Sequence, residues 1–196
     1  MQALLRVSRL IDGLNERIGR VMYWLVLVAV IVSAGNAISR KVLNLSSNAY
    51  LELQWYLFSA LFLFCAGYTL LRNEHVRIDV VAGRFSARTQ AWIDIFGTVF
   101  FLLPMAVLFI YLSWPIFIRT YVQGEISTNA GGLLIWPARF MVPVGFTLLT
   151  LQGLSELIKR IAFLTGHGPD PMLRIDPLAA EKELAKDLGH AAEERP

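Results

Sequence analysis

The sequence is most informative for what four long stretches lack, which is charge. Residues 21–39, 53–71, 95–118 and 140–155 contain no Asp, Glu, Lys or Arg. The chain of 196 residues is 56% hydrophobic, and its mean hydropathy of +0.53 is high for a soluble domain. A helix needs roughly 20 apolar residues to cross the hydrocarbon core of a bilayer. The absence of charge therefore excludes an ordinary soluble fold and indicates a membrane protein.

Cysteine and histidine are scarce, and this excludes several kinds of site. Cys65 is the only cysteine, so the chain forms no internal disulfide and no thiolate metal site. The histidines, His75, His167 and His190, all lie outside the charge-free stretches, which excludes a haem held by histidines of facing helices. An enzyme acting inside the membrane would need catalytic groups there, and none is charged. No cofactor, no enzymatic activity and no nucleic-acid partner are expected.

The predicted fold is an all-α integral membrane bundle of four transmembrane helices, with interfacial amphipathic helices at the N-terminus and in the inner loop. The spans are expected at about 21–39, 50–71, 92–118 and 133–158. The first stretch is longer than the apolar part of a signal peptide and has no clear Ala-x-Ala cleavage site, so it is expected to remain as a helix. Prolines inside the third and fourth spans predict bends in those helices.

The distribution of cations predicts the orientation of the spans. Cytoplasmic segments next to a membrane carry the excess of Lys and Arg. If the N-terminus is inside, the inner segments hold ten cations and the outer segments four. The ten are Arg6, Arg9, Arg17, Arg20, Arg72, Arg77, Arg84, Arg88, Lys159 and Arg160, and the four are Arg40, Lys41, Arg119 and Arg139. Both termini are therefore expected in the cytoplasm.

Two segments flank the predicted transmembrane domain of residues 21–160. Apolar side chains recur at helical spacing along residues 1–20 and into the start of the first span, namely at Leu4, Val7, Ile11, Leu14, Ile18 and Val21. This pattern predicts an amphipathic helix, which either lies on the inner membrane surface or extends the first span into the cytoplasm. Residues 161–196 become rich in breakers and charge from Gly166 onward, which predicts a solvated cytoplasmic tail.

Polar residues near the outer helix ends are candidate contact residues. Glu52, Gln54 and Trp55 open the second span, where an aromatic side chain anchors a helix at the interface. Arg139 falls in the first turns of the fourth span. We hypothesise an ion pair between Glu52 and Arg139; the alternative is that each side chain reaches water separately.

The loop after the second span holds the candidates Arg72, His75, Arg77 and Asp79. The preference for cations on the inner side accounts for the arginines without any further function. Asp79 is suited to cap a short interfacial helix, and Arg77 with Asp79 is suited to clamp the turn before it. His75 has no second ligand beside it, so a metal site is not indicated.

Several short motifs occur together in an informative order. They are "LELQWYLF" from residue 51, "LRNEHVRIDV" from residue 71, "GEIS" followed by "NAGG" between residues 124 and 132, and "WPARFMVPVGF" with "LQGLSELIKRI" from residue 136. In this order the chain resembles the small membrane subunit (DctQ-like) of tripartite ATP-independent periplasmic (TRAP) transporters. The similarity covers residues from about 15 to 165.

The resemblance implies partners and a role that spacing alone does not reveal. It implies a large permease subunit that carries the sodium and substrate sites, and a periplasmic binding protein that delivers an organic acid. The small subunit then braces the large one in a bacterial inner membrane. The resemblance also singles out Gly124, Glu125 and Ser127 in the outer loop as a surface near the docked binding protein. An ordinary exposed turn is the alternative for these three.

Two other functions are compatible with the residues themselves. The chain is either a free-standing four-span protein, such as a small channel or a membrane enzyme, or a membrane anchor that recruits a cytoplasmic partner through its tail. The lack of charge within the spans argues against transport by this chain alone, because intramembrane charges usually mark ion and substrate pathways.

Overall fold

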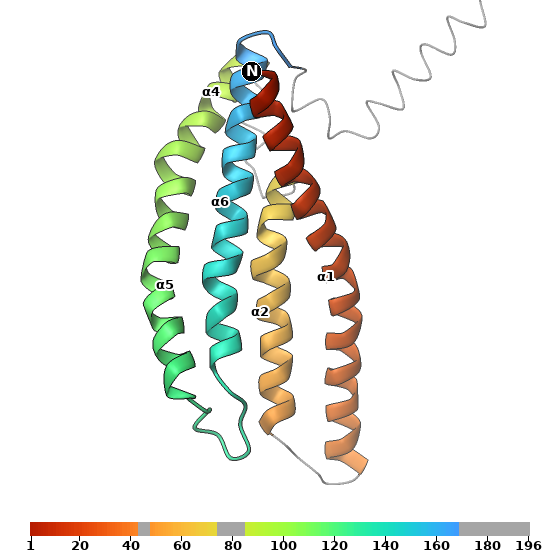
Figure 1. The fold of residues 1–196 in the computed structure, drawn as a ribbon. Coiled ribbons are helices and arrows are strands. Elements are labelled where there is room, and N and C mark those ends of the chain that lie inside the picture. Colours follow the sequence, from red (N-terminus) through yellow and green to blue (C-terminus); the bar gives the residue numbers. More distant parts are fainter. Residues whose placement is uncertain (43–47, 74–84, 169–196) are drawn as a thin grey trace, which may run out of the picture.

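The computed structural model describes residues 1–42, 48–73 and 85–168, and within them the chain is a bundle of long helices (Figure 1). The elements are α1 (Gln2–Val42), α2 (Asn48–Leu71), α4 (Ala87–Gly97), the π-helix η1 (Thr98–Leu102), α5 (Leu103–Gln123) and α6 (Trp136–Leu164). The tail beyond residue 168 and the first part of the predicted interfacial helix after Asp79, up to residue 84, lie outside the described residues.

Four helical stretches are long and apolar enough to cross a membrane. They are Gln2–Val42, Asn48–Leu71, Ala87–Gln123 and Trp136–Leu164. The third stretch joins α4, η1 and α5 into one continuous helical run. Large apolar side chains stand exposed on these helices, with Phe62 at 78% and Tyr111 at 74%, as expected where lipid rather than water is the solvent. The predicted all-α bundle of four spans is confirmed.

α6 is the central helix of the bundle. It packs against α2, α5 and α1, whereas α5 packs chiefly on α6 and α1 packs chiefly on α2 (Figure 1). Half of the most apolar stretch of α6 is buried, compared with 11% in α1 and 6% in the third stretch. The residues of α6 therefore decide how the other helices are held.

α1 is a single uninterrupted helix of 41 residues, which corresponds to a length of about 62 Å. Residues 2–20 continue into the first span without a break. Of the two alternatives left open by the sequence, this part therefore extends the first span. The buried positions in this part are the polar or small residues Ser8, Asn15 and Gly19. The polar side of the N-terminal half thus faces the bundle, and much of its apolar stripe faces outward.

Two glycines allow the helices to approach closely. A Cβ on Gly67 of α2 would lie 2.4 Å from Oδ1 of Asn15 in α1, and a Cβ on Gly145 of α6 would lie 2.7 Å from Cβ of Leu63 in α2. Neither position has room for a side chain. Small residues at such crossings are typical of membrane helices, where association depends on close packing.

The π-helix η1 precedes Pro104 at the start of α5. Proline has no backbone N–H to donate, and its ring clashes with the preceding turn of a regular α-helix. The wider turn of η1 accommodates this, with the backbone N–H of Leu103 bound to the carbonyl oxygen of Thr98. The irregularity predicted for the third span is therefore a π-turn just before its first proline.

Candidate functional site

The described polar side chains that bind one another gather mainly at the two ends of the bundle. The loop cluster comprises Glu52, Thr120, Glu125, Ser127, Asn129 and Arg139, next to the connection between α5 and α6. The terminal cluster comprises Ser8, Asp12, Asn15, Asp94, Gln152, Ser155, Glu156, Lys159 and Arg160, near the N-terminus.

Glu52 is the centre of the loop cluster. It lies near the start of α2 and is only 5% exposed. Its carboxylate accepts hydrogen bonds from the hydroxyl of Ser127, from Nδ2 of Asn129 at 2.7 Å and from the backbone N–H of Leu133 at 2.7 Å. Hydrogen bonds to an ionised acceptor are stronger than those between neutral groups. Glu52 therefore holds the connecting loop against α2.

Two further side chains of α2 bind the same loop. Nδ2 of Asn48 donates to the carbonyl oxygen of Ala130 at 3.2 Å, and the hydroxyl of Tyr56 donates to that of Leu134 at 3.0 Å. Within the loop, an isolated antiparallel bridge joins Ile126 and Leu134. The loop is thus attached to α2 over more than two helical turns.

Arg139 joins the two helices that flank the loop. Its guanidinium donates to Oγ1 of Thr120 at the end of α5, and to Glu125 at 2.8 Å and 3.3 Å. This corrects the hypothesised ion pair between Glu52 and Arg139. Both residues belong to the loop cluster, but the folded loop brings Ser127 and Asn129 to Glu52 and leaves Glu125 for Arg139.

The remaining candidates at this end differ in exposure. Trp55 is 66% exposed on the surface of α2, and Gln54 is half-buried. Gly124 ends α5 with a φ of 60°, in the left-handed region that favours glycine. Its backbone N–H binds the carbonyl oxygens of Thr120 and Tyr121. Gly124 therefore sets the direction in which the loop leaves the helix.

The terminal cluster is a chain of paired charges. Nζ of Lys159 lies 3.1 Å from Asp12 and also binds Glu156. Arg160 lies 2.6 Å from Glu156 and 2.9 Å from Asp94 of α4. Glu156 and Arg160 are 4% and 3% exposed. Buried charges are tolerated when they are paired and hydrogen-bonded, so this chain of contacts joins α1, α4 and α6.

Neutral side chains complete the terminal cluster. Gln152 is fully buried, accepts from Nδ2 of Asn15 at 2.9 Å, and donates to Asp12 at 2.9 Å and to Glu156 at 3.1 Å. The hydroxyl of Ser155 donates to Asp12 at 2.7 Å. The side-chain oxygen of Asn15, Oδ1, has no hydrogen-bond partner and lies against Gly67. Gln152 is therefore the residue through which the amides and the charges are connected.

A smaller ion pair joins α1 to the end of α2. Nη2 of Arg72 lies 2.6 Å from Glu16, and the guanidinium also lies over the ring of Tyr68. Partial burial acts to lower the pKa of Arg72, but the hydrogen bond to Tyr68 and the charge of Glu16 outweigh it, so the pKa is raised above its usual value. The other candidates of this loop, His75, Arg77 and Asp79, lie outside the described residues.

The terminal cluster was only partly predicted from the sequence. Asp94, Glu156 and Arg160 lie near helix ends, where a charge suits anchoring at the membrane surface, whereas Ser8, Asn15 and Gln152 were not singled out. The available signal was their helical spacing. Ser8, Asp12 and Asn15 recur on one side of α1, and Gln152, Ser155 and Lys159 on one side of α6.

The chemistry of both clusters is structural binding rather than reaction. In the terminal cluster three acids face two cations, a net charge of −1, and every one of these charged groups has a charged partner. Within the described residues, no three His, Cys, Asp or Glu side chains gather as a metal site. The arrangement fixes helices to one another.

Fold and site together define a multi-pass helical membrane protein whose two ends are closed by polar contacts. A family model for the DctQ component of tripartite ATP-independent periplasmic transporters matches residues 29–163. The chain belongs to this family, as the motifs predicted, and is a small membrane component of such a transporter. Searches of curated proteins and of solved structures gave no significant match.

Proposed function

We propose that this chain braces the large permease subunit during sodium-coupled, binding-protein-dependent uptake of an organic acid. The family supplies the transporter class and, in general terms, the two partners: a large permease and a binding protein. We further propose sodium coupling, an organic acid as the substrate and the bracing role. The chain is proposed to act as a structural component and not as an enzyme.

One observation carries this proposal, which is that the buried charges of the terminal cluster are bound to charges of opposite sign. Asp12, Asp94 and Glu156 bind Lys159 and Arg160 between three helices. A transport site needs polar groups that are free to exchange partners with an ion or a substrate. Side chains that are bound to one another across helices favour a scaffold that stays fixed while another subunit moves.

We propose a bacterial inner membrane, with both termini in the cytoplasm. The terminal cluster then lies near the cytoplasmic face and the loop cluster near the periplasmic face. The excess of cations on the N-terminal side of the spans supports this orientation.

The loop between α5 and α6 is proposed as a contact surface for the binding protein. Glu125 and Ser127 are partly buried and bind Arg139 and Glu52, so they act by shaping the loop, whereas Gly124 and Thr128 are exposed. Trp55 is proposed as a contact for the large subunit, because it is the most exposed of the candidate residues on α2. Replacing Trp55 by alanine is expected to reduce co-purification of the large subunit.

Reconstitution tests the bracing role directly. The large permease subunit of the same organism is placed in proteoliposomes with or without this chain, with its binding protein, a sodium gradient and a labelled organic acid. We expect uptake only when both membrane subunits are present. Full uptake by the large subunit alone contradicts the bracing role, and uptake by this chain alone supports a free-standing transporter or channel.

Deletion of residues 166–196 separates this proposal from an anchor that recruits a cytoplasmic partner. The proposed function expects nearly normal uptake from the shortened chain, because the two clusters lie within residues 8–160. Loss of uptake, with the membrane complex still assembled, supports the anchor instead.

A further inference from the structure

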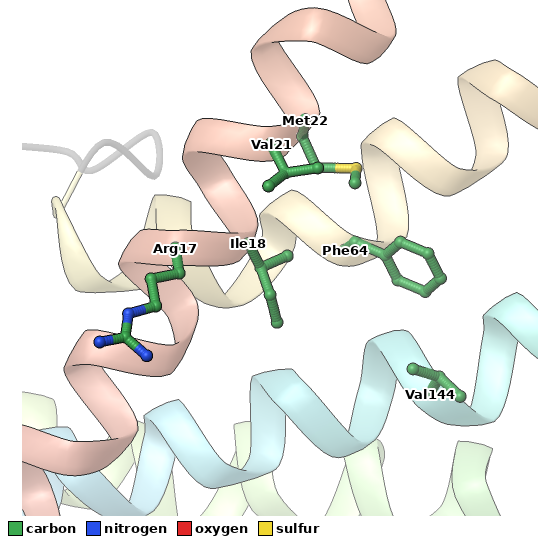
Figure 2. A pocket seen from close by; sticks show the side chains of 6 residues that line it. All are labelled: Arg17, Ile18, Val21, Met22, Phe64 and Val144. Carbon is green, nitrogen blue, oxygen red and sulfur yellow. The ribbon is translucent and has the colours of Figure 1, made fainter.

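A cavity opens between α1, α2 and α6. Its volume is about 320 Å³, and it is lined by Arg17, Ile18, Val21, Met22, Phe64 and Val144 (Figure 2). Five of these six side chains are apolar. Figure 2 shows Ile18 pointing into the space between α1 and α6, and Arg17 at one edge of it. The cavity therefore has an apolar body and one cationic edge.

The cavity lies where two apolar stripes meet. Ile18 and Val21 belong to the stripe of α1 that begins at Leu4, much of which faces away from the bundle. Val144 belongs to a stripe of α6 spaced by three or four residues, none of which is buried, namely Phe140, Val144, Thr147, Leu151, Leu154, Ile158 and Ile161. Even the central helix thus has one open side, and the cavity opens on it toward the bilayer.

Arg17 carries a positive charge that no acid among the described residues neutralises. The two acids of the same part of α1 are bound elsewhere, Asp12 to Lys159 and Glu16 to Arg72. Among the described residues, no acid forms an ion pair with Arg17. The apolar residues of the cavity extend from Arg17 into the spans, so Arg17 lies at the end of the cavity nearest the membrane surface.

We propose that this cavity holds one acyl chain of an anionic phospholipid whose phosphate is bound by Arg17. Phosphate is a strong partner for a guanidinium, and basic pockets between transmembrane helices bind anionic head groups. The cavity accommodates roughly ten groups of the size of water, enough for part of an acyl chain. Its cationic edge favours a lipid with an anionic head group over an apolar helix of another protein.

Native mass spectrometry of the full chain in detergent tests the site with two probes. Phosphatidylglycerol is anionic, and phosphatidylcholine with the same acyl chains is zwitterionic. We expect one phosphatidylglycerol molecule to bind about fivefold more tightly than phosphatidylcholine, since one cation near the surface contributes roughly a factor of five. Equal binding of the two lipids would overturn the proposal.

Two pairs of variants separate the charge from the cavity. Arg17→Gln is expected to lower phosphatidylglycerol binding about fivefold, to the level of phosphatidylcholine, while the control Arg9→Gln leaves it unchanged. Val144→Trp fills the cavity and is expected to lower binding of both lipids at least tenfold. The control Leu108→Trp, at a position 53% exposed on α5, is expected to have no effect.

Size-exclusion chromatography checks that each variant is folded. If Val144→Trp does not fold, Met22→Trp replaces it, because it fills the same cavity from α1. Lipid binding that survives a folded cavity-filling variant overturns the site. So does a preference for phosphatidylglycerol that is the same in Arg17→Gln as in Arg9→Gln. If no lipid binds in the cavity, and its lining residues are covered only when the large permease subunit is added, the occupant is a protein. That result also overturns the lipid site.

Discussion

Asp12 of α1 and Lys159 of α6 form an ion pair of 3.1 Å across 147 positions of the chain. Lys159 binds Glu156 as well, and Glu156 in turn binds Arg160. The pair is therefore the entry to a continuous set of contacts that reaches α4. It holds the N-terminal half of α1 against the central helix α6.

Replacing Gln152 by leucine is expected to destabilise the bundle by about 2–3 kcal/mol. The substitution leaves Nδ2 of Asn15 without its side-chain acceptor and removes a donor from Asp12 and Glu156, and an unmade hydrogen bond to a buried polar group is costly. Thermal unfolding in detergent measures the effect. The control Thr147→Val, at an exposed position of α6, is expected to change stability by less than about 0.5 kcal/mol. Equal effects of the two variants would contradict the role given to Gln152.

Replacing Gly67 by alanine is expected to destabilise the bundle by about 1–3 kcal/mol, because the new Cβ would lie 2.4 Å from Oδ1 of Asn15 and α1 must move away. Gly13→Ala is the matched control, since nothing lies within 4 Å of its added Cβ. There the better helix propensity of alanine is expected to stabilise the chain by about 0.5–1 kcal/mol. Opposite signs in thermal unfolding support the close crossing of α1 and α2, whereas two stabilised variants would argue against it.

Replacing Glu52 by glutamine is expected to loosen the loop between α5 and α6 and to lower the melting temperature by several degrees. The amide keeps the size of the side chain but removes the charge that binds Ser127, Asn129 and the N–H of Leu133. Ser127→Ala removes one neutral donor and is expected to have a smaller effect. Limited proteolysis of the loop provides a second measurement. A loop as resistant in Glu52→Gln as in the wild type would show that the carboxylate does not hold it.

A double-mutant cycle distinguishes the partner of Arg139. The cycle of Arg139→Gln with Glu125→Gln is expected to give a coupling of about 0.5–1 kcal/mol, a modest value because both side chains are partly exposed. The cycle of Arg139→Gln with Glu52→Gln is expected to give a coupling near zero. A larger coupling with Glu52 would restore the pair hypothesised from the sequence.

The sequence allowed the prediction of the number of spans and of their all-α class because both depend on local composition. A run without charge, such as residues 53–71, is long enough to cross a bilayer whatever surrounds it. The ends of the helices were less predictable. α1 begins at Gln2, well before its charge-free run, because a helix continues beyond the membrane where its polar side finds partners.

The sequence predicted several residues of the loop cluster but not which of them bind one another. Glu52 and Arg139 were chosen from their positions near helix ends, and Glu125 and Ser127 from the family resemblance; all four lie in the loop cluster. Which of them bind one another depends on how the loop folds, and spacing does not determine that. Gln152 was missed because an amide carries no formal charge and lies within the charge-free run of residues 140–155.

The long sequence separation of the polar contacts has a consequence for the biosynthesis of the chain. Glu52 binds its loop partners 75 or more positions later, and Asp12 binds Lys159 at the far end of α6. The helices of a membrane protein are inserted first and associate afterwards. Glu52 therefore has no loop partner until residues 127–133 are made, and Asp12 does not meet Lys159 until α6 is made. Both carboxylates are synthesised long before the groups that bind them.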